Sequence, residues 1–388
     1  MQRLRNVPWE ALRADVALPA IARVLDGAAA EREVERALRG SRELSSEGRA
    51  AVVEAIFGVA LWRRRLLWHT GAQPPGEPAM LLASLLRDLA GLPEARALAL
   101  SGAAHVPRRN GVPERLADRW SLPDWLEAHL LTELGGDAEA FCAAIAVPGP
   151  VCLRANRLLC TREELAARLA GEAIDTVPAP RAPDALLVTT SAPNLFGSPA
   201  WRDGWFEPQD EGSQLLGELV GAQPGESVLD LCAGAGGKSL LLAARGARVL
   251  AYDVDRSRLE RLRTRAARAR AATSIEIVER PSEADHVLVD APCSELGTLR
   301  RGPDARWRID PRSLKSLPPL QRELLEVAAP LARKRLVYAT CTIHRRENDD
   351  VASAFERDHP ELGRTTTWRT LPHRDGTDGF FGVVWERR

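Results

Sequence analysis

A glycine-rich turn between a short apolar run and a helical stretch constrains the fold of this chain more than any other segment. Residues 227–231 have the composition of a buried strand, and residues 232–239 turn from it into a helix that we expect to begin near Leu240. Glycines let the backbone approach a ligand closely and leave the amides of the helix N-terminus free to bind polar groups. The spacing disfavours a P-loop, because the glycine required five positions before Gly237 is Cys232. The pattern predicts one strand, turn and helix unit of an open α/β sheet.

An acidic residue follows the next apolar run. Residues 247–252 predict a strand that ends at Asp253, about 20 residues after the turn. Nucleotide-binding α/β units keep an acid at this place for the hydroxyls of a ribose. The turn and the acid together favour a nucleoside-containing cofactor over an ordinary connection between strand and helix. A nicotinamide dinucleotide stays open on these two features, although no redox constellation accompanies them.

Two cysteines follow two later strand-like runs. Cys293 lies in the segment Asp-Ala-Pro-Cys-Ser at residues 290–294, and Cys341 lies in the segment Tyr-Ala-Thr-Cys-Thr at residues 338–342. If both runs are parallel strands, both thiols lie at strand C-termini, where open α/β sheets build their sites. Either cysteine alone is more simply explained as a buried structural thiol. The pair indicates a thiol-based reaction.

Composition sets limits on the kind of protein. The chain has 388 residues, 45% of them hydrophobic, which predicts two or three domains. Basic and acidic residues, 53 of each, cancel, so any nucleic-acid surface must be a local patch. Six cysteines without a CxxC pair and seven scattered histidines indicate neither a disulfide framework nor a metal site. No apolar leader or membrane-spanning run occurs, so we expect a cytoplasmic monomer with reduced thiols and no membrane partner.

The apolar spacing divides the chain into three parts and predicts a multi-domain fold. Residues 1–135 have helical spacing and predict an all-α bundle, in which Ser45 or Ser46 caps one helix. Residues 136–205 combine short β-like runs with one helical stretch and predict a small α+β subdomain. Residues 206–388 predict a C-terminal α/β, Rossmann-like domain.

Basic side chains cluster in several places. The arginine run at residues 63–65 is more typical of a charged helix flank than of an RNA-facing patch. The loop after Cys293 holds a second cluster, which consists of Arg300, Arg301, Arg306, Trp307 and Arg308. Phosphate contacts and base stacking use such residues, and a surface salt-bridge loop is the alternative. The pattern alone does not assign Arg154, Asn156 and Arg157 to phosphate binding, although their side chains could make such contacts.

The motifs around Lys238, Cys293 and Cys341 resemble those of the Sun (Fmu) type RNA cytosine-C5 methyltransferases. Residues 205–214 also resemble the segment that precedes the cofactor motif in this family. The helical bundle is similar to the NusB-like RNA-binding domain that the ribosomal RNA members carry. The chain departs from the family pattern at Gly234-Ala235, where Ala-Pro is usual, and at Glu295-Leu296-Gly297, where Gly-Thr-Gly is common.

The resemblance implies S-adenosylmethionine as the cofactor. It implies that the following residues bind it: Cys232, Ala233, Gly234, Ala235, Gly236, Gly237, Lys238, Asp253 and Asp290. It also implies that Cys341 is the nucleophile for carbon 6 of cytosine and that Cys293 assists the breakdown of the adduct. Asp290 is expected to bind the edge of the cytosine, and Lys238, Arg300 and Arg301 are expected to contact the substrate.

The chemistry of cytosine explains why such a site needs thiols. Carbon 5 is a poor nucleophile, so a thiolate must first add to carbon 6. A free thiol is mostly protonated at neutral pH, and we therefore expect a positive neighbour such as Lys238 to lower the pKa of Cys341. The target base must leave its stack or already be single-stranded.

The sequence therefore predicts S-adenosylmethionine-dependent methylation of carbon 5 of a cytosine in RNA. The helical domain favours small-subunit ribosomal RNA as the substrate, and thus a role in rRNA processing. One alternative is a transfer RNA methyltransferase, and another is an RNA-binding platform without turnover. A protein or small-molecule methyltransferase is disfavoured, because such methyl acceptors need no covalent activation.

Overall fold

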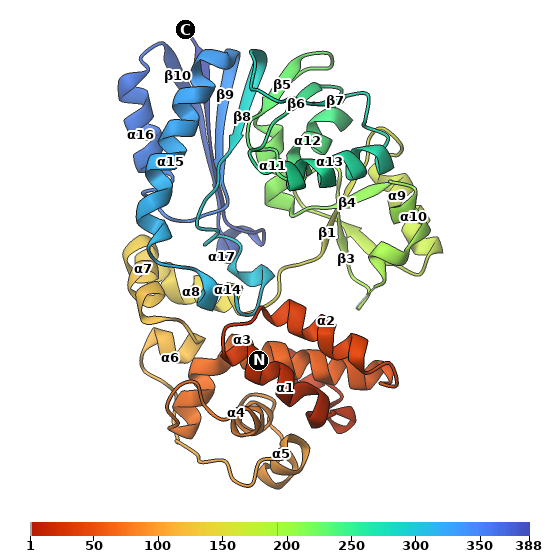
Figure 1. Cartoon of the computed structure of the whole chain (residues 1–388), viewed down its shortest axis with the longest axis vertical. Coiled ribbons are helices and arrows are strands. Elements are labelled where there is room, and N and C mark those ends of the chain that lie inside the picture. Colours follow the sequence, from red (N-terminus) through yellow and green to blue (C-terminus); the bar gives the residue numbers. More distant parts are fainter. Residues whose placement is uncertain (1, 192) are drawn as a thin grey trace. The chain divides into compact units, whose positions relative to one another are not determined.

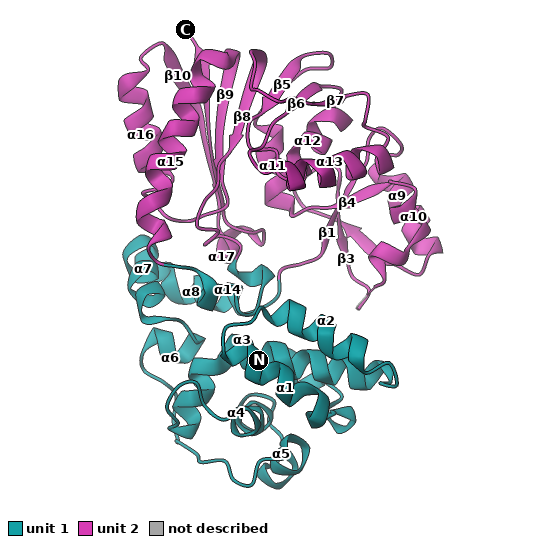
Figure 2. Ribbon diagram, in the orientation of Figure 1, with its two compact units in different colours: residues 1–148, 299–310 teal, residues 149–298, 311–388 magenta. Residues whose placement is uncertain are grey.

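The computed structural model describes residues 2–191 and 193–388 and divides into two compact units (Figure 1, Figure 2). Unit 1 comprises Met1–Pro148 and Leu299–Asp310, and unit 2 comprises Gly149–Thr298 and Pro311–Arg388. The predicted fold class, a helical N-terminal part followed by α/β sheet domains, is confirmed. The predicted boundaries after residues 135 and 205 differ from this division, because residues 136–148 and 299–310 join the helical unit. The three-part domain division stays a prediction.

The described residues of unit 1 form helices and connecting loops, without a strand. Its α-helices are α1 (Ala14–Leu25), α2 (Ala30–Gly40), α3 (Ser46–Thr70), α4 (Pro78–Ser84), α5 (Glu94–Ser101), α6 (Leu116–Trp120), α7 (Asp124–Leu134), α8 (Ala138–Ile145) and α14 (Ala305–Arg308). A π-helical turn over Leu85–Leu89 follows α4, and short 3-10 turns include η6 (Leu299–Arg301). One hydrophobic core joins α1 to α5.

Helix α3 is the central element of unit 1. The Ser45 hydroxyl caps it by accepting the Gly48 N–H at 3.1 Å, as the sequence predicts. A Cβ atom on Gly58 would lie only 2.7 Å from the Leu85 side chain, so the glycine permits close packing against the π-helical turn. Among the described residues, no helix is both long and apolar enough to cross a membrane.

The segment that returns from unit 2 is anchored by Arg306. Its side chain is 0% exposed, and its guanidinium donates to the carbonyl oxygens of Trp120 at 3.0 Å and Ile145 at 2.9 Å. The Trp307 indole N–H donates to the carbonyl oxygen of Ala60 at 3.1 Å. Neither alternative left open for Arg306, an RNA contact or a surface salt bridge, agrees with the structure, because the helical unit encloses this side chain.

The arginines at residues 63–65 of α3 also make contacts within unit 1. Arg64 pairs with Asp118 at 2.6 Å, and Arg65 donates to the carbonyl oxygen of Arg119 at 3.0 Å. The guanidinium of Arg63 lies 3.8 Å from the centre of the Trp307 ring. These contacts agree with the interpretation of the run as a helix flank and give each cation a structural partner.

Unit 2 contains two sheets. The smaller one has the order β2-β3-β1-β4, and all its pairings are antiparallel. Its strands are β1 (Cys152–Ala155), β2 (Thr176–Pro178), β3 (Ala185–Val188) and β4 (Phe206–Pro208), and its helices are α9 (Arg162–Gly171) and α10 (Pro199–Arg202). The predicted runs at residues 151–153 and 185–189 correspond to β1 and β3.

The larger sheet has seven strands in the order β10-β11-β9-β8-β5-β6-β7. The strands are β5 (Ser227–Asp230), β6 (Arg248–Ala251), β7 (Ile275–Ile277), β8 (Ala284–Asp290), β9 (Ala332–Thr340), β10 (Leu362–Thr370) and β11 (Phe380–Arg387). The pairings among β5 to β9 are parallel, whereas β11 pairs antiparallel with both β9 and β10. The strand order reverses between β5 and β8, which is where doubly wound sheets bind ligands.

Helices cover both faces of the larger sheet (Figure 1). They are α11 (Glu211–Glu218), α12 (Gly237–Ala244), α13 (Arg256–Arg268), α15 (Ser313–Ala328), α16 (Asp349–Asp358) and the short α17 (Pro372–Asp375). Side chains of α11, α12 and α13 form one hydrophobic core with the sheet, and side chains of α15 and α16 form the other. This three-layer arrangement explains why central strands contain runs of buried apolar residues, such as residues 228–229 of β5 and 287–289 of β8.

Replacing Arg306 by methionine should destabilise unit 1 by about 3 kcal/mol, because two buried carbonyl groups lose charge-assisted hydrogen bonds. Urea denaturation of the full chain, followed by circular dichroism and tryptophan fluorescence, measures the change. The matched control is Arg39→Met, since Arg39 forms an exposed pair with Glu35 and should contribute no more than about 0.5 kcal/mol. Equal losses for the two variants would contradict the anchoring role of Arg306.

Candidate functional site

The parallel strands of the larger sheet end at a common edge. Asp230, the last residue of β5, pairs with Ala251 at the end of β6 and with Leu288 of β8. Asp290, the last residue of β8, pairs with Ala339 of β9. The segments that follow these strands carry the predicted glycine turn, acid and cysteines. The structure therefore brings these groups to one edge of the sheet, as the sequence predicts.

The glycine turn after β5 depends on backbone conformations that favour glycine. Gly234 and Gly236 have φ angles of 54° and 82°. A Cβ atom on Gly236 would lie 2.0 Å from a methyl carbon of Leu262, so only glycine fits there. The Gly234 N–H donates to the Asp253 carboxylate at 2.8 Å. Helix α12 begins at Gly237, which is earlier than the predicted start at Leu240, and its first amides face the end of the strand.

Arginines hold the carbonyl oxygens of the same turn. Arg154 of β1 donates to the carbonyl oxygen of Gly237 at 2.9 Å, and Arg265 of α13 donates to that of Ala235 at 2.5 Å. Glu207 of β4 accepts from Arg265 at 2.9 Å. Arg154 is only 4% exposed, and burial lowers its pKa to about 10. The segment 205–214 thus supports the glycine turn through Glu207.

Arg154 and Asn156 are therefore structural residues of unit 2. The Asn156 amide donates to the carbonyl oxygens of Gly204 at 2.9 Å and Ala269 at 2.8 Å, and its side chain is buried. Buried groups with protein partners are not available to a phosphate. The sequence left their role unassigned, and the structure uses both side chains inside unit 2.

Acidic groups line the ends of β5 and β6. Asp230 is 1% exposed and accepts the Ser239 hydroxyl at 2.6 Å, and burial raises its pKa to about 7. Asp253 accepts the backbone N–H of Asp255 at 2.8 Å with its second oxygen. Val254, directly after Asp253, is 86% exposed and presents an apolar surface beside this carboxylate. Cys232 lies in the same turn, and burial raises the pKa of its thiol.

Lys238 and Asp290 form an ion pair at the strand reversal. The Lys238 ammonium lies 2.6 Å from the Asp290 carboxylate, and the lysine side chain is 9% exposed. Burial opposes the charge of the ammonium, but the Asp290 carboxylate outweighs this effect and raises the pKa of Lys238. Both residues were predicted for the cofactor site, and the structure places them in contact.

The two cysteines meet at the ends of β8 and β9. Their sulfur atoms lie 3.3 Å apart, and the Cys341 backbone N–H points to the Cys293 sulfur at 3.4 Å. The hydrogen bond with Cys293, burial and the charge of Asp290 raise the pKa of Cys341 well above its ordinary value. The expectation that a positive neighbour lowers this pKa is therefore wrong here, because the charge of Lys238 is neutralised by Asp290.

Arg300 and Arg301 lie in the 3-10 turn η6, which belongs to unit 1. Arg301 is exposed and Arg300 is half-buried. Their predicted role in substrate binding stays a prediction.

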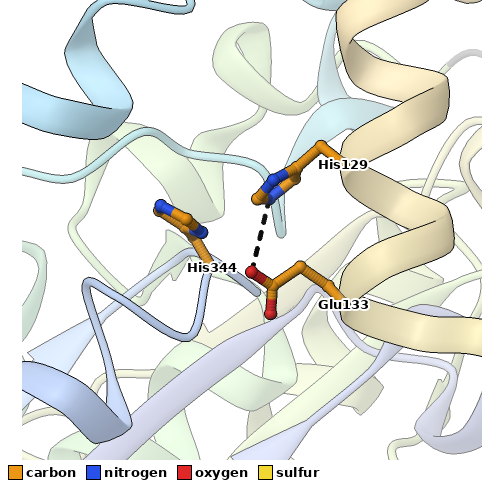
Figure 3. Close-up of side chains that lie close together, drawn as sticks. All are labelled: His129, Glu133 and His344. Atoms are coloured by element: carbon orange, nitrogen blue, oxygen red, sulfur yellow. Dashed lines mark ion pairs between the residues drawn. The ribbon is translucent and has the colours of Figure 1, made fainter.

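A possible pair of metal ligands lies on α7. Figure 3 shows His129 and Glu133 directed toward one another, with 4.0 Å between the imidazole Nε2 and a carboxylate oxygen. Such pairs one helical turn apart are common ion pairs, and two groups do not complete a metal site. His344, labelled in the same figure, belongs to unit 2, where its backbone N–H donates to the Thr342 hydroxyl at 3.1 Å. The prediction that the protein holds no metal remains a prediction.

Several residues of the site were not assigned from the sequence. Val254 could have been found, because it directly follows the strand-end acid. Arg265 and Gln321 have no local signal, since they lie on helices and reach the site only through the fold. Glu347 lies in a family-like segment, but its contacts with the Cys293 loop depend on tertiary structure.

Comparison with known proteins shows which family this chain resembles in sequence. Residues 218–384 match the family model described as 16S rRNA methyltransferase RsmB/F, and residues 122–193 match its ferredoxin-like domain model. The chain is 35% identical over 279 residues to ribosomal RNA small subunit methyltransferase B of Yersinia pseudotuberculosis, a match that covers 67% of this chain and 65% of that protein. It is 34% identical over 299 residues to the probable ribosomal RNA small subunit methyltransferase B of Synechocystis, a match that covers 69% of this chain and 67% of the relative.

A solved structure extends the similarity of the fold. The crystal structure of PH0851 superposes with a TM-score of 0.80, covers 98% of this chain and 99% of its own, and is 23% identical. The match with the Yersinia protein spans 65% of that protein's length, a little under two thirds. On the Synechocystis match and the two family models, the chain belongs to the RsmB/F family of 16S rRNA methyltransferases.

Proposed function

We propose that this protein transfers a methyl group from S-adenosylmethionine to carbon 5 of a cytosine in RNA, through a covalent bond between Cys341 and carbon 6. One observation carries the proposal. Two thiols from the ends of adjacent parallel strands lie 3.3 Å apart, beside a strand-end carboxylate, Asp290, that pairs with Lys238. A methyl acceptor that is already nucleophilic would need neither thiol.

The edge of the sheet fits a sulfonium nucleoside cofactor. Asp253 offers a carboxylate for ribose hydroxyls, and the exposed Val254 offers an apolar surface for a purine. The glycine turn leaves room for close approach to the first amides of α12. S-adenosylmethionine supplies the methyl group and a positive charge when it is bound. Asp290 and Lys238 are the remaining chain groups proposed to face it.

The chain's own residues account for the steps of the proposed reaction. The Cys341 thiolate adds to carbon 6, and the electron pair of the 5,6 double bond becomes available at carbon 5, which takes the methyl group. Asp290 hydrogen-bonds the cytosine edge and stabilises the protonated ring nitrogen of the adduct. Cys293 then helps to remove the proton from carbon 5. The bond between Cys341 and carbon 6 breaks, and its electrons restore the double bond.

Small-subunit ribosomal RNA is the proposed substrate. The relatives that share 34% and 35% identity with this chain are named for that RNA. The cytosine must be unstacked to reach thiols at a strand edge, so a single-stranded or flipped nucleotide is required. The proposal also places the protein in the cytoplasm, where ribosomal subunits are assembled.

The direct test is methylation with labelled S-adenosylmethionine of unmodified 16S rRNA, small ribosomal subunits and transfer RNA, followed by nucleoside analysis. We expect labelled 5-methylcytidine in ribosomal RNA, and Cys341→Ala should reduce it by at least about 100-fold because no adduct can form. Cys293→Ala should instead accumulate a protein–RNA complex that survives denaturation. The matched control is Cys160→Ala, which removes a thiol from the core of the smaller sheet.

Each result has a distinct meaning for the proposal. Label in transfer RNA alone would show that transfer RNA, and not ribosomal RNA, is the substrate. Label in a nucleoside other than 5-methylcytidine would refute the carbon 5 chemistry. Binding of S-adenosylhomocysteine, measured by calorimetry, without label in any RNA would favour an RNA-binding platform. Full activity of Cys341→Ala would exclude the covalent route.

The raised pKa of Cys341 predicts the pH dependence of its reactivity. Only the thiolate reacts with iodoacetamide, so alkylation of Cys341 in the free protein should still be increasing above its ordinary pKa of 9.0. Cys293→Ala removes the first cause of the shift and should lower the pKa, which makes alkylation faster at pH 8. Peptide mapping by mass spectrometry gives the rate at each pH. A wild-type midpoint below 8.5, or a midpoint that does not change in Cys293→Ala, would contradict this account.

A further inference from the structure

A buried polar network lies behind the two cysteine loops. Gln321 of α15 and Glu347 are each 0% exposed. One oxygen of the Glu347 carboxylate accepts the Ser294 N–H at 2.9 Å and the Gln321 amide at 2.9 Å. The same Gln321 amide donates to the carbonyl oxygen of Pro292 at 2.9 Å. Gln321 and Glu347 thus hold the backbone on both sides of Cys293.

The network also fixes the loop that carries Cys341. The Tyr338 hydroxyl donates to the backbone oxygen of Glu347 at 2.6 Å. The hydroxyls of Ser294 and Thr342 lie 2.8 Å apart and connect the two loops directly. Asn348 donates to the carbonyl oxygen of Thr342 at 2.9 Å. The residues next to both cysteines are therefore tied to one cluster.

The composition of this cluster is costly for stability. The second oxygen of the Glu347 carboxylate is buried without a hydrogen-bond partner among the described residues, and burying a carboxylate is unfavourable unless it is well paired. Apolar side chains of similar volume would fill the same space at lower cost. They would not bind the Ser294 N–H or the Pro292 carbonyl. Gln321 and Glu347 therefore fix the backbone conformation of the Cys293 loop at a cost in stability.

We infer that Gln321 and Glu347 are positioning residues, which keep the Cys293 thiol next to the Cys341 thiol. The catalytic consequence rests on the proposed function: the step assigned to Cys293, release of the methylated base from Cys341, requires both sulfur atoms at the same nucleotide. A loop displaced by about 1 Å misplaces such a group enough to slow its step strongly. Loss of the clamp should therefore slow release more than methyl transfer.

The test uses a reagent that reports the distance between two thiols without any RNA. Phenylarsine oxide binds two neighbouring thiols, forming two arsenic–sulfur bonds and releasing one water. We expect Gln321→Met to weaken its binding to the full-length protein by about tenfold or more, because the Pro292 carbonyl and Glu347 lose their donor. Cys293→Ala/Cys341→Ala gives the background from the other thiols. The matched control, Glu323→Gln, changes an exposed residue of the same helix and should leave the affinity unchanged.

Exchanging the amide and the carboxylate between residues 321 and 347 tests their hydrogen bond directly. Gln321→Glu keeps the size of the side chain but places two carboxylates together, and it should weaken phenylarsine oxide binding as much as Gln321→Met. The exchange Gln321→Glu/Glu347→Gln restores an amide–carboxylate hydrogen bond but gives the Pro292 carbonyl oxygen no donor, so it should bind phenylarsine oxide more tightly than Gln321→Glu and less tightly than the wild type. Under the proposed function, both single variants at residue 321 also accumulate the protein–RNA complex during methylation.

The outcomes separate this inference from the proposed function. Phenylarsine oxide binding that stays within about twofold of the wild-type value in folded Gln321→Met and Gln321→Glu would overturn the inference. Recovery of the full wild-type affinity by the exchange variant, which has no donor for the Pro292 carbonyl oxygen, would contradict the role assigned to that hydrogen bond. If the wild-type protein methylates no RNA while the arsenical results hold, the positioning role stands and the proposed reaction fails.

Discussion

The parallel register of β5, β6, β8 and β9 is the constraint on which the site depends. Because these strands end at one edge, four connecting segments that are far apart in the chain place their first residues side by side. A slip of one residue between β8 and β9 would turn Asp290 and the cysteine loops to the wrong faces. Hydrophobic cores on both faces of the sheet oppose such a slip. The chemistry of the site thus depends on apolar packing, and Cys341 itself packs against one of these cores.

Side chains that do not face the proposed ligands fix the backbone positions of the loops at this edge of the sheet. Arg154 and Arg265 fix the carbonyl oxygens of the glycine turn, and Glu347 fixes the amide after Cys293. Arg154 and Glu347 are charged and buried, which makes them expensive as sources of stability. They supply directional hydrogen bonds, which apolar packing cannot provide. The smaller sheet contributes Arg154 and Glu207, so it supports the proposed cofactor loop directly.

Features that lie within one contiguous segment could be predicted from the sequence. The apolar runs, the glycine turn, Asp253 and the two cysteine motifs are contiguous segments, and the structure places them at one sheet edge as expected. The pattern did not reveal the buried roles of Arg154, Asn156 and Arg306. Their partners lie far away in the sequence, such as Trp120 for Arg306 and Ala269 for Asn156. A pattern of residue types does not contain such pairings. For the same reason the sequence did not predict the return of residues 299–310 to the helical unit.

The charges and burial at this edge of the sheet keep the proposed nucleophile, Cys341, protonated and therefore unreactive in the free protein. The hydrogen bond with Cys293, burial, and the charges of Cys293, Asp290 and Glu295 all raise the pKa of Cys341 and favour the protonated, unreactive thiol. The charge of Lys238, whose ammonium lies 2.6 Å from the Asp290 carboxylate, does not outweigh them. A further positive charge at this edge would favour the thiolate, as would any change that separates Lys238 from Asp290. The proposed cofactor carries such a charge, so its binding and the activation of the nucleophile are expected to be coupled. The protein would then hold its thiolate mainly when a methyl group is present to be transferred.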